Sequence, residues 1–185
     1  MEPLRLVITG RPGSGKSTLL MKIVDHLRGR GLVVGGVVTP EVRGGSGFRE
    51  GFKMRDLMSG EEVWLARRGY PSRLRVGSYG VLIDADAFAS RALSSALEAA
   101  NVIAIDEVGP MELLLPSFKS GLLNVLRSHK PVLLVVHYRL NEPEIVSALR
   151  GAERVEVTFH NRQSLAASLP QAVYARITKN AAAGR

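Results

Sequence analysis

The strongest constraint on how this chain can fold is a glycine-rich octapeptide that joins an apolar run, residues 4–8, to an amphipathic stretch. Its sequence is Gly10-Arg11-Pro12-Gly13-Ser14-Gly15-Lys16-Ser17, which fits the pattern G-x-x-x-x-G-K-[ST] in full. Glycines have no Cβ, so such a loop can curl until its backbone N–H groups converge on one point. Those donors and the positive end of the following helix form a site for a polyphosphate. The octapeptide therefore predicts a strand–loop–helix unit that binds phosphate.

The rest of the chain alternates apolar runs with amphipathic stretches. Continuous aliphatic and β-branched runs at residues 4–8, 32–38, 102–105 and 132–136 are typical of strands buried on both faces. The apolar stripes of the intervening helices are Leu19, Leu20, Ile23, Val24 and Leu27; Phe88, Ala92, Leu93, Ala96, Leu97 and Ala100; and Phe118, Leu122, Val125 and Leu126, the last stripe opened by Pro116. This alternation predicts a layered α/β domain with a largely parallel sheet.

Residues 39–84 break the alternation, because they contain no helical stripe. A turn signal at residues 44–47 is followed by alternating apolar and basic residues, which predicts an antiparallel β excursion attached to the parallel core. Residues 43–75 carry eight cations and four anions, half of the net charge of +8 of the whole chain. Two interpretations stay open: a solvated strand face, or a surface that faces phosphate or a nucleic acid.

Length and composition narrow the class of protein. The chain has 185 residues and no cysteine, which excludes a disulfide scaffold, a thiol nucleophile and a thiolate metal site. Its apolar runs are much shorter than a membrane span requires. We therefore expect a single domain over residues 1–185, monomeric, cytoplasmic and without membrane contact.

The apolar run at residues 102–105 ends in two adjacent carboxylates, Asp106 and Glu107. In an open α/β sheet, ligands gather at the carboxyl ends of strands, where the glycine-rich loop also lies. We expect Asp106 and the Ser17 hydroxyl to hold Mg²⁺, and Lys16 to reach the oxygens between the β- and γ-phosphates. Since successive strand residues point to opposite faces, Glu107 is expected to have a different role, that of general base for an attacking water. This pair of acids favours nucleotide hydrolysis.

Longer stretches around these residues share a pattern with a known family. The most specific is Ile105-Asp106-Glu107-Val108-Gly109-Pro110-Met111-Glu112-Leu113. The others are Val37-Val38-Thr39-Pro40-Glu41-Val42-Arg43, Gly51-Phe52, Val135-Val136-His137-Tyr138-Arg139 and Val157-Thr158-Phe159-His160-Asn161-Arg162. From Leu4 to Arg176 the chain resembles the THEP1 nucleoside-triphosphatases, which include the human cancer-related nucleoside-triphosphatase. The resemblance implies a RecA-like P-loop NTPase fold, a three-layer sandwich with a mixed sheet. It also implies Mg²⁺-dependent hydrolysis of several nucleoside triphosphates to diphosphate and phosphate.

Nucleotide contacts are expected from three stretches. They are Gly10, Arg11, Pro12, Gly13, Ser14, Gly15, Lys16, Ser17 and Thr18 in the loop; Val102, Ile103, Ala104, Ile105, Asp106, Glu107, Val108 and Gly109 at the acidic strand end; and Asn161 with Arg162. Asn161 is also a good helix N-cap by residue type, so a purely structural role stays open for it. If the pair borders the base, Arg162 would stack on it.

The expected catalytic residues are Lys16, Glu107 and Arg139. A guanidinium at Arg139 would neutralise charge that develops on the γ-phosphate. His137 would hydrogen-bond the phosphate or the water, and Arg43 and Arg49 are other candidates for the cation. For Arg139 and His137, a structural role at the end of the strand is an equal alternative.

Three other functions compete with hydrolysis of ATP, GTP, CTP, UTP and dTTP. One is a kinase that transfers the γ-phosphate to a small molecule or a nucleic-acid end, although the residues after Glu112 show no arginine-rich lid. Another is a nucleotide-gated nucleic-acid-binding module, which the basic excursion favours. A GTPase switch is the weakest, because the chain has no N-K-x-D motif to read guanine. Since no segment offers a base-reading motif, we expect the enzyme to accept several bases.

Overall fold

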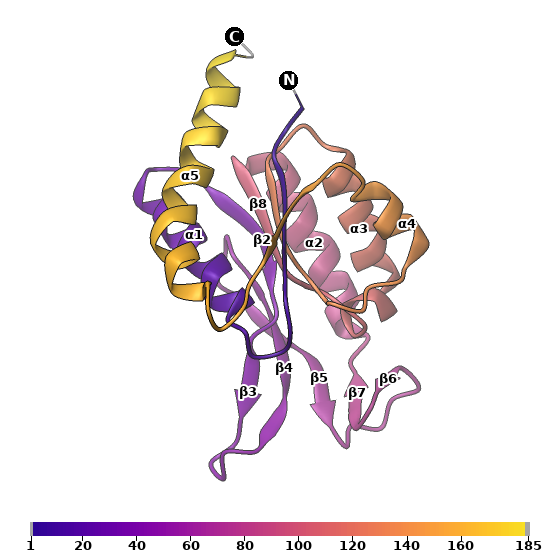
Figure 1. The fold of residues 1–185 in the computed structure, drawn as a ribbon. Coiled ribbons are helices and arrows are strands. Elements are labelled where there is room, and N and C mark those ends of the chain that lie inside the picture. The colour runs from indigo at the N-terminus through magenta and orange to yellow at the C-terminus, as the bar shows by residue number, and fades with distance from the viewer. Residues whose placement is uncertain (1, 184–185) are drawn as a thin grey trace.

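The structure is a computed structural model that describes residues 2–183, and one sheet runs through that part of the chain (Figure 1). Its parallel half consists of β1 (Arg5–Thr9), β2 (Val34–Val38), β8 (Val102–Val108), β9 (Val132–Val136) and β10 (Glu153–Glu156). Its antiparallel half consists of β3 (Glu41–Arg43), β4 (Arg49–Asp56), β5 (Glu62–Arg68), β6 (Arg75–Val76) and β7 (Tyr79–Val81). The strand order is β10-β1-β9-β8-β2-β4-β5-β7-β6, and β3 pairs with β4.

Helices cover both faces of the parallel half (Figure 1). On one face α1 (Lys16–Gly29) packs beside α5 (Arg162–Ala183), and on the other α2 (Asp84–Ala99) packs beside α3 (Pro116–Arg127). The short helix α4 (Pro143–Ala148) lies against α3, and the 3-10 turn η1 (Glu112–Leu114) follows β8. Separate clusters of buried apolar side chains lie on the two sides of the sheet. The predicted α/β three-layer sandwich is confirmed.

The predicted stripes are the faces that the helices bury. α1 buries Leu19, Leu20, Ile23, Val24 and Leu27, and α3 begins at Pro116 and buries Phe118, Leu122, Val125 and Leu126. Proline suits the first turn of a helix because its missing N–H would have no partner there. β2 and β9 are buried at every position, as continuous apolar runs predict. In residues 2–183, no helix has both the length and the apolar composition that crossing a membrane requires.

The excursion predicted at residues 39–84 is confirmed. β3 to β7 fill this range, and α2 begins at Asp84. β4 pairs with β2, with Val37 opposite Asp56 and Val38 opposite Arg55, so the antiparallel half continues the central sheet. In Figure 1 its strands project from the end of the molecule at which α1 begins. The antiparallel half therefore lies next to the carboxyl ends of the parallel strands.

Candidate active site

The glycine-rich loop connects β1 to α1 in the predicted conformation. Gly10, Gly13 and Gly15 have φ values of 146°, 75° and 105°, which residues with a Cβ rarely adopt. A Cβ at Gly10 would also collide with the backbone oxygen of Val157. No side chain caps α1 at Gly15, and its first turn contains no acid. The first amide groups of α1 can therefore donate to a bound anion.

Lys16 and Ser14 add polar groups to this loop. The Lys16 ammonium donates to the backbone oxygens of Gly10 and Arg11, each at 3.1 Å, so it lies across the loop. The Ser14 hydroxyl is buried and has no hydrogen-bond partner among the described residues. A buried hydroxyl that makes no hydrogen bond lowers the stability of the folded protein. An unbonded hydroxyl at Ser14 is therefore consistent with a loop that binds a polar ligand.

Asp106 and Glu107 lie near the carboxyl end of β8. The register of β8 against β9 shifts between Asp106 and Val108, so the strict alternation of side chains ends at Glu107. Both carboxylates consequently line one cavity together with Lys16 and Ser17. The alternation of strand residues alone does not predict that both acids line one cavity.

Burial decides the electrostatics of both acids. It raises the pKa of Asp106 to about 6; the Ser17 side chain and Lys16 lower this pKa, and the charge of Glu107 raises it further. Burial also raises the pKa of Glu107, which Lys16 opposes. Two crowded carboxylates beside a serine hydroxyl are hard oxygen ligands, so Ser17 and Asp106 fit a divalent cation such as Mg²⁺.

The cavity has a volume of about 640 Å³ and extends well beyond the loop. Its lining residues come mainly from the glycine-rich loop, from the ends of β2 and β8, and from the antiparallel half, which contributes Arg49, Phe52 and Arg55. Arg49 forms an ion pair with Glu41, and Arg55 donates to Glu62 at 2.7 Å. Arg49 and Arg43 are the other two candidates for the catalytic cation. Arg49 lines the cavity, whereas Arg43 is exposed and pairs with Glu41 at 2.6 Å.

His137 follows β9 and lines the same cavity. Its backbone N–H donates to Val108, and its Nδ1 accepts from the backbone N–H of Arg139 at 3.2 Å. Partial burial, Lys16 and Arg139 lower the pKa of His137, which favours the neutral imidazole. Arg139 itself is exposed and is not among the residues that line the cavity. Its guanidinium lies 5.1 Å over the ring of Tyr138, which does line it.

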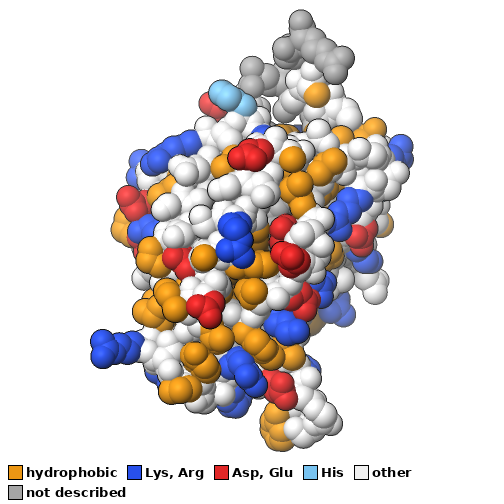
Figure 2. Space-filling view, turned by 180° about the vertical axis from the view of Figure 1, so that it is seen from behind, with side chains coloured by type: hydrophobic (Ala, Val, Ile, Leu, Met, Phe, Trp, Pro, Cys, Tyr) orange, Lys and Arg blue, Asp and Glu red, His pale blue; other side chains and the backbone are white. Residues whose placement is uncertain are grey.

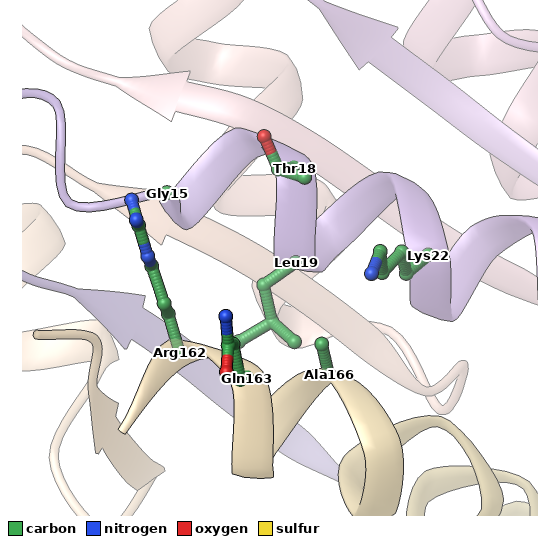
Figure 3. Close-up of a pocket in the computed structure, with 7 residues that line it drawn as sticks. All are labelled: Gly15, Thr18, Leu19, Lys22, Arg162, Gln163 and Ala166. Atoms are coloured by element: carbon green, nitrogen blue, oxygen red, sulfur yellow. The ribbon is translucent and has the colours of Figure 1, made fainter. Parts of the chain in front are cut away.

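A smaller pocket of about 290 Å³ lies between α1 and α5 (Figure 3). Its lining residues are Gly15, Thr18, Leu19 and Lys22 from α1 and Arg162, Gln163 and Ala166 from α5. The Arg162 side chain extends from the first turn of α5 toward Gly15. Arg162 and Thr18 therefore both line a pocket next to the glycine-rich loop.

The Asn161 side chain is occupied within its own turn. Its Oδ1 accepts from the backbone N–H of Thr158 and its Nδ2 donates to the backbone oxygen of Glu156, both at 2.8 Å. It thus closes the turn before α5 and bonds backward along the chain, where an N-cap side chain would bond forward to the helix. Val102, Ile103, Ala104 and Ile105, also predicted at the site, are wholly buried in β8 and support Asp106 from the core.

Sequence reasoning did not single out two polar residues of this cavity, Thr39 and Glu112. Thr39 directly follows β2, so the rule that ligands gather at the carboxyl ends of parallel strands would have found it. Glu112 is an acid among apolar neighbours, and it is only 5% exposed. An acid in such surroundings is a signal in its own right, because buried carboxyls are rare without a function.

The loop after β1 and the acids on β8, at one edge of a sheet with helices on both faces, define the class: a P-loop NTPase fold. The sequence model of the NTPase family matches residues 5–169. The nucleoside-triphosphatase THEP1 of Hyperthermus butylicus is 43% identical over 180 residues, which cover 97% of this chain and 96% of that protein. The protein of the same name from Thermofilum pendens is 40% identical over 183 residues, with 97% and 100% covered.

A solved structure agrees with these relatives. The crystal structure of THEP1 from the hyperthermophile Aquifex aeolicus matches with a TM-score of 0.78 and 31% identity, covering 90% of this chain and 96% of that one. The chain belongs to the NTPase family, and the resemblance expected from its sequence is confirmed.

Proposed function

We propose that this protein hydrolyses nucleoside triphosphates to the diphosphate and inorganic phosphate. The observation that carries the proposal is the pair Asp106 and Glu107, which line one cavity with Lys16 and Ser17 of the glycine-rich loop. Membership of the NTPase family, whose relatives carry the name nucleoside-triphosphatase, supports the same reaction. The reaction needs no acceptor other than water.

Each group has a role that its position supports. The amides at the start of α1 and the Lys16 ammonium bind the β- and γ-phosphates. Ser17 and Asp106 are the residues that would hold Mg²⁺, which when bound neutralises phosphate charge. Glu107 accepts a proton from the attacking water while the water oxygen bonds to the γ-phosphorus and the bond to the bridging oxygen breaks. Arg139, which is exposed, stays a candidate for the cation, and Arg49 is the alternative that lines the cavity.

The bound base would lie in the pocket between α1 and α5. Its lining combines Leu19, Ala166 and the guanidinium of Arg162, groups that contact the face of any base. We therefore propose ATP, GTP, CTP, UTP and dTTP as substrates. A monomeric state, one domain over residues 1–185 and a cytoplasmic location stay predictions.

A kinase is the second candidate, and the size of the larger cavity favours it. The space beyond the loop reaches Arg49, Phe52 and Arg55, where an acceptor molecule would fit. Analysis of the products distinguishes the two functions. Release of inorganic phosphate from purified protein without any added acceptor supports hydrolysis, and phosphate transfer seen only with an acceptor supports the kinase.

The decisive experiment measures phosphate release from the five triphosphates, with and without Mg²⁺. We expect release from all five and none after chelation of the cation. If chelation of the cation leaves phosphate release unchanged, the proposal that Ser17 and Asp106 hold Mg²⁺ is wrong. No release from any triphosphate would refute hydrolysis.

A further inference from the structure

Glu112 is the most buried acid of the cavity, and the proposed reaction does not use it. It lies in η1, six positions after Asp106, and its side chain is packed against Gly109, where an added Cβ would be 3.2 Å from Glu112 Oε2. Among residues 2–183, none of the ion pairs involves Glu112. A buried carboxyl without a cation needs another explanation for its place in the fold.

The partner of Glu112 is Thr39, which sits at the centre of a small hydrogen-bond network. Thr39 Oγ1 is 3.0 Å from Glu112 Oε1 and 2.9 Å from the backbone oxygen of Asp106. It also accepts the backbone N–H of Glu107 at 3.2 Å. Thr39 therefore holds the peptide between the two acids, at the point where the register of β8 shifts.

The hydrogen-bond donors and acceptors around Thr39 indicate the protonation state of the Glu112 carboxyl. A threonine hydroxyl has one proton to donate and two lone pairs to accept with. The backbone oxygen of Asp106 can only accept, so the Thr39 proton belongs there, and the N–H of Glu107 can only donate. The third contact is then satisfied only if Glu112 donates. An ionised Glu112 would compete for the single proton and leave two oxygens facing each other without one.

The electrostatics agree with this count. Burial raises the pKa of Glu112 to about 8, its own backbone N–H and Thr39 lower this pKa, and the charges of Glu107 and Asp106 raise it. The acids of this part of the cavity therefore disfavour a further negative charge.

We propose that Glu112 is a neutral carboxylic acid and acts, through Thr39, as a positioning residue for the backbone that carries Glu107. The kinetic consequence rests on the proposed hydrolysis, whereas the protonation of Glu112 does not. A glutamine can take the place of a protonated glutamate, because its amide N–H donates where the acid O–H donated. The two glutamates of this site should thus respond oppositely to the same substitution.

The kinetic experiment compares Glu112→Gln, Glu112→Ala, Thr39→Ser and Thr39→Val. We expect Glu112→Gln and Thr39→Ser to keep kcat within about fivefold of the wild type, the ratio that corresponds to ~1 kcal/mol. Glu112→Ala and Thr39→Val should lose ~10- to 10²-fold in kcat with little change in nucleotide affinity, because a supporting group is lost while the loop is intact. The double variant Thr39→Val with Glu112→Ala should be no worse than either single one, since both act through one bond.

Infrared spectroscopy of the nucleotide-free protein tests the protonation separately from turnover. We expect a carboxylic-acid C=O band at neutral pH that is absent from Glu112→Gln and unchanged in the control Glu98→Gln, an exposed glutamate of α2. If that band is missing from the wild type, or if Glu112→Gln loses kcat as strongly as Glu107→Gln does, Glu112 acts as a carboxylate and the proposal is wrong. If Glu112→Ala and Thr39→Val keep wild-type kcat, the positioning role is wrong. Should Glu112→Ala fail to fold, Glu112→Gln and the infrared band decide.

Discussion

The two halves of the sheet differ in what surrounds their strands. In the parallel half, β2 and β9 are buried at every residue and β8 at all but Glu107, since helices cover both faces. In the antiparallel half, β4 and β5 contain two buried residues each among half-buried and exposed ones, and they carry several basic side chains. Figure 2 shows the lower part of the molecule, where Figure 1 places β3 to β7, with Lys and Arg beside hydrophobic side chains.

The parallel half holds the proposed catalytic residues rigidly, whereas the cations of the antiparallel half mainly contact residues of their own half. Lys16, Asp106 and Glu107 must be held within a fraction of an ångström, and strands locked by packing on both faces provide that rigidity. The cations of the antiparallel half contact acids and aromatic rings of the same half, as Lys53 does with Glu62 at 3.2 Å and Arg67 does with Trp64 at 4.6 Å. Substitutions of Lys16, Asp106 and Glu107 should therefore impair the reaction, and those of Lys53 and Arg67, which do not line the cavity, should leave it nearly unchanged.

The largest effect is expected from Lys16→Ala. It removes the ammonium that we propose binds the phosphates, and losing one preorganised donor typically costs ~10²–10³-fold in kcat, with a larger loss for a charged donor. The Lys16 side chain is not part of the apolar core, so thermal unfolding should be unchanged. The measurements are phosphate release and thermal unfolding, with Lys179→Ala on the exposed side of α5 as the control. Wild-type turnover, or an unfolded variant, would contradict the role of Lys16.

Glu107→Gln should keep the fold and nucleotide affinity but lose the chemical step. The amide is nearly isosteric and cannot take a proton from water, and removal of a general base typically costs ~10²–10⁴-fold in rate. Calorimetric nucleotide binding and single-turnover hydrolysis separate the two quantities. Weak binding combined with a normal hydrolysis rate of the bound nucleotide would move the general base elsewhere, and His137 is then the residue to test.

Asp106→Asn should weaken binding and turnover together, and only in the presence of Mg²⁺. The substitution removes a negative charge beside Ser17, so the affinity for the nucleotide should lose its Mg²⁺ dependence while affinity without the cation stays the same. Because Asp106 and Glu107 are adjacent on β8, any general damage to the strand would affect both variants alike. Titrations of nucleotide at several Mg²⁺ concentrations therefore test whether the neighbours have distinct roles.

Much of the parallel half was predictable from sequence, because its signals are local. The glycine-rich loop and the apolar stripes of α1 and α3 depend on residues close in the chain. The local signal for β10 is weaker, because its residues Glu153–Glu156 are mostly exposed, and the strand is held by its pairing with β1. The register shift at Glu107 depends on its pairing with β9, so the shared cavity of the two acids could not be derived from alternation. The contact of Thr39 with Glu112 likewise joins residues far apart in the sequence.

A smaller effect is expected when the base of the substrate is changed. The pocket beside Arg162 offers an exposed guanidinium and apolar groups in place of buried polar groups matched to one base. Discrimination of more than about a thousandfold requires such matched groups, so kcat/KM should vary less than that among the five triphosphates. Arg162→Ala should lower the affinity for all of them to a similar extent. A loss confined to one base would show that Arg162 reads the base edge.

The smallest effect is expected in the antiparallel half, from the double variant Lys53→Ala with Arg67→Ala. These cations lie 5.5 Å and 4.6 Å from the centre of the Trp64 ring, and cation–π contacts at exposed sites contribute ~0.5–1 kcal/mol each. We expect a modest loss of unfolding free energy and turnover within about fivefold of the wild type, a ratio that corresponds to ~1 kcal/mol. Denaturant unfolding and phosphate release measure the two quantities.

The same double variant decides whether the basic strands bind nucleic acid. A surface for RNA or DNA needs cations that can displace counterions from phosphates, and binding then falls steeply with salt. Here Arg49, Lys53 and Arg55 already pair with Glu41 or Glu62, so we expect no retention of RNA or DNA in a gel-shift experiment at moderate salt. Retention by the wild type that the double variant loses would instead make the antiparallel half a nucleic-acid-binding surface. In that case the parallel half would carry out the reaction and the antiparallel half would bind the nucleic acid. The cavity, which residues of both halves line, would then connect nucleotide turnover to nucleic-acid binding.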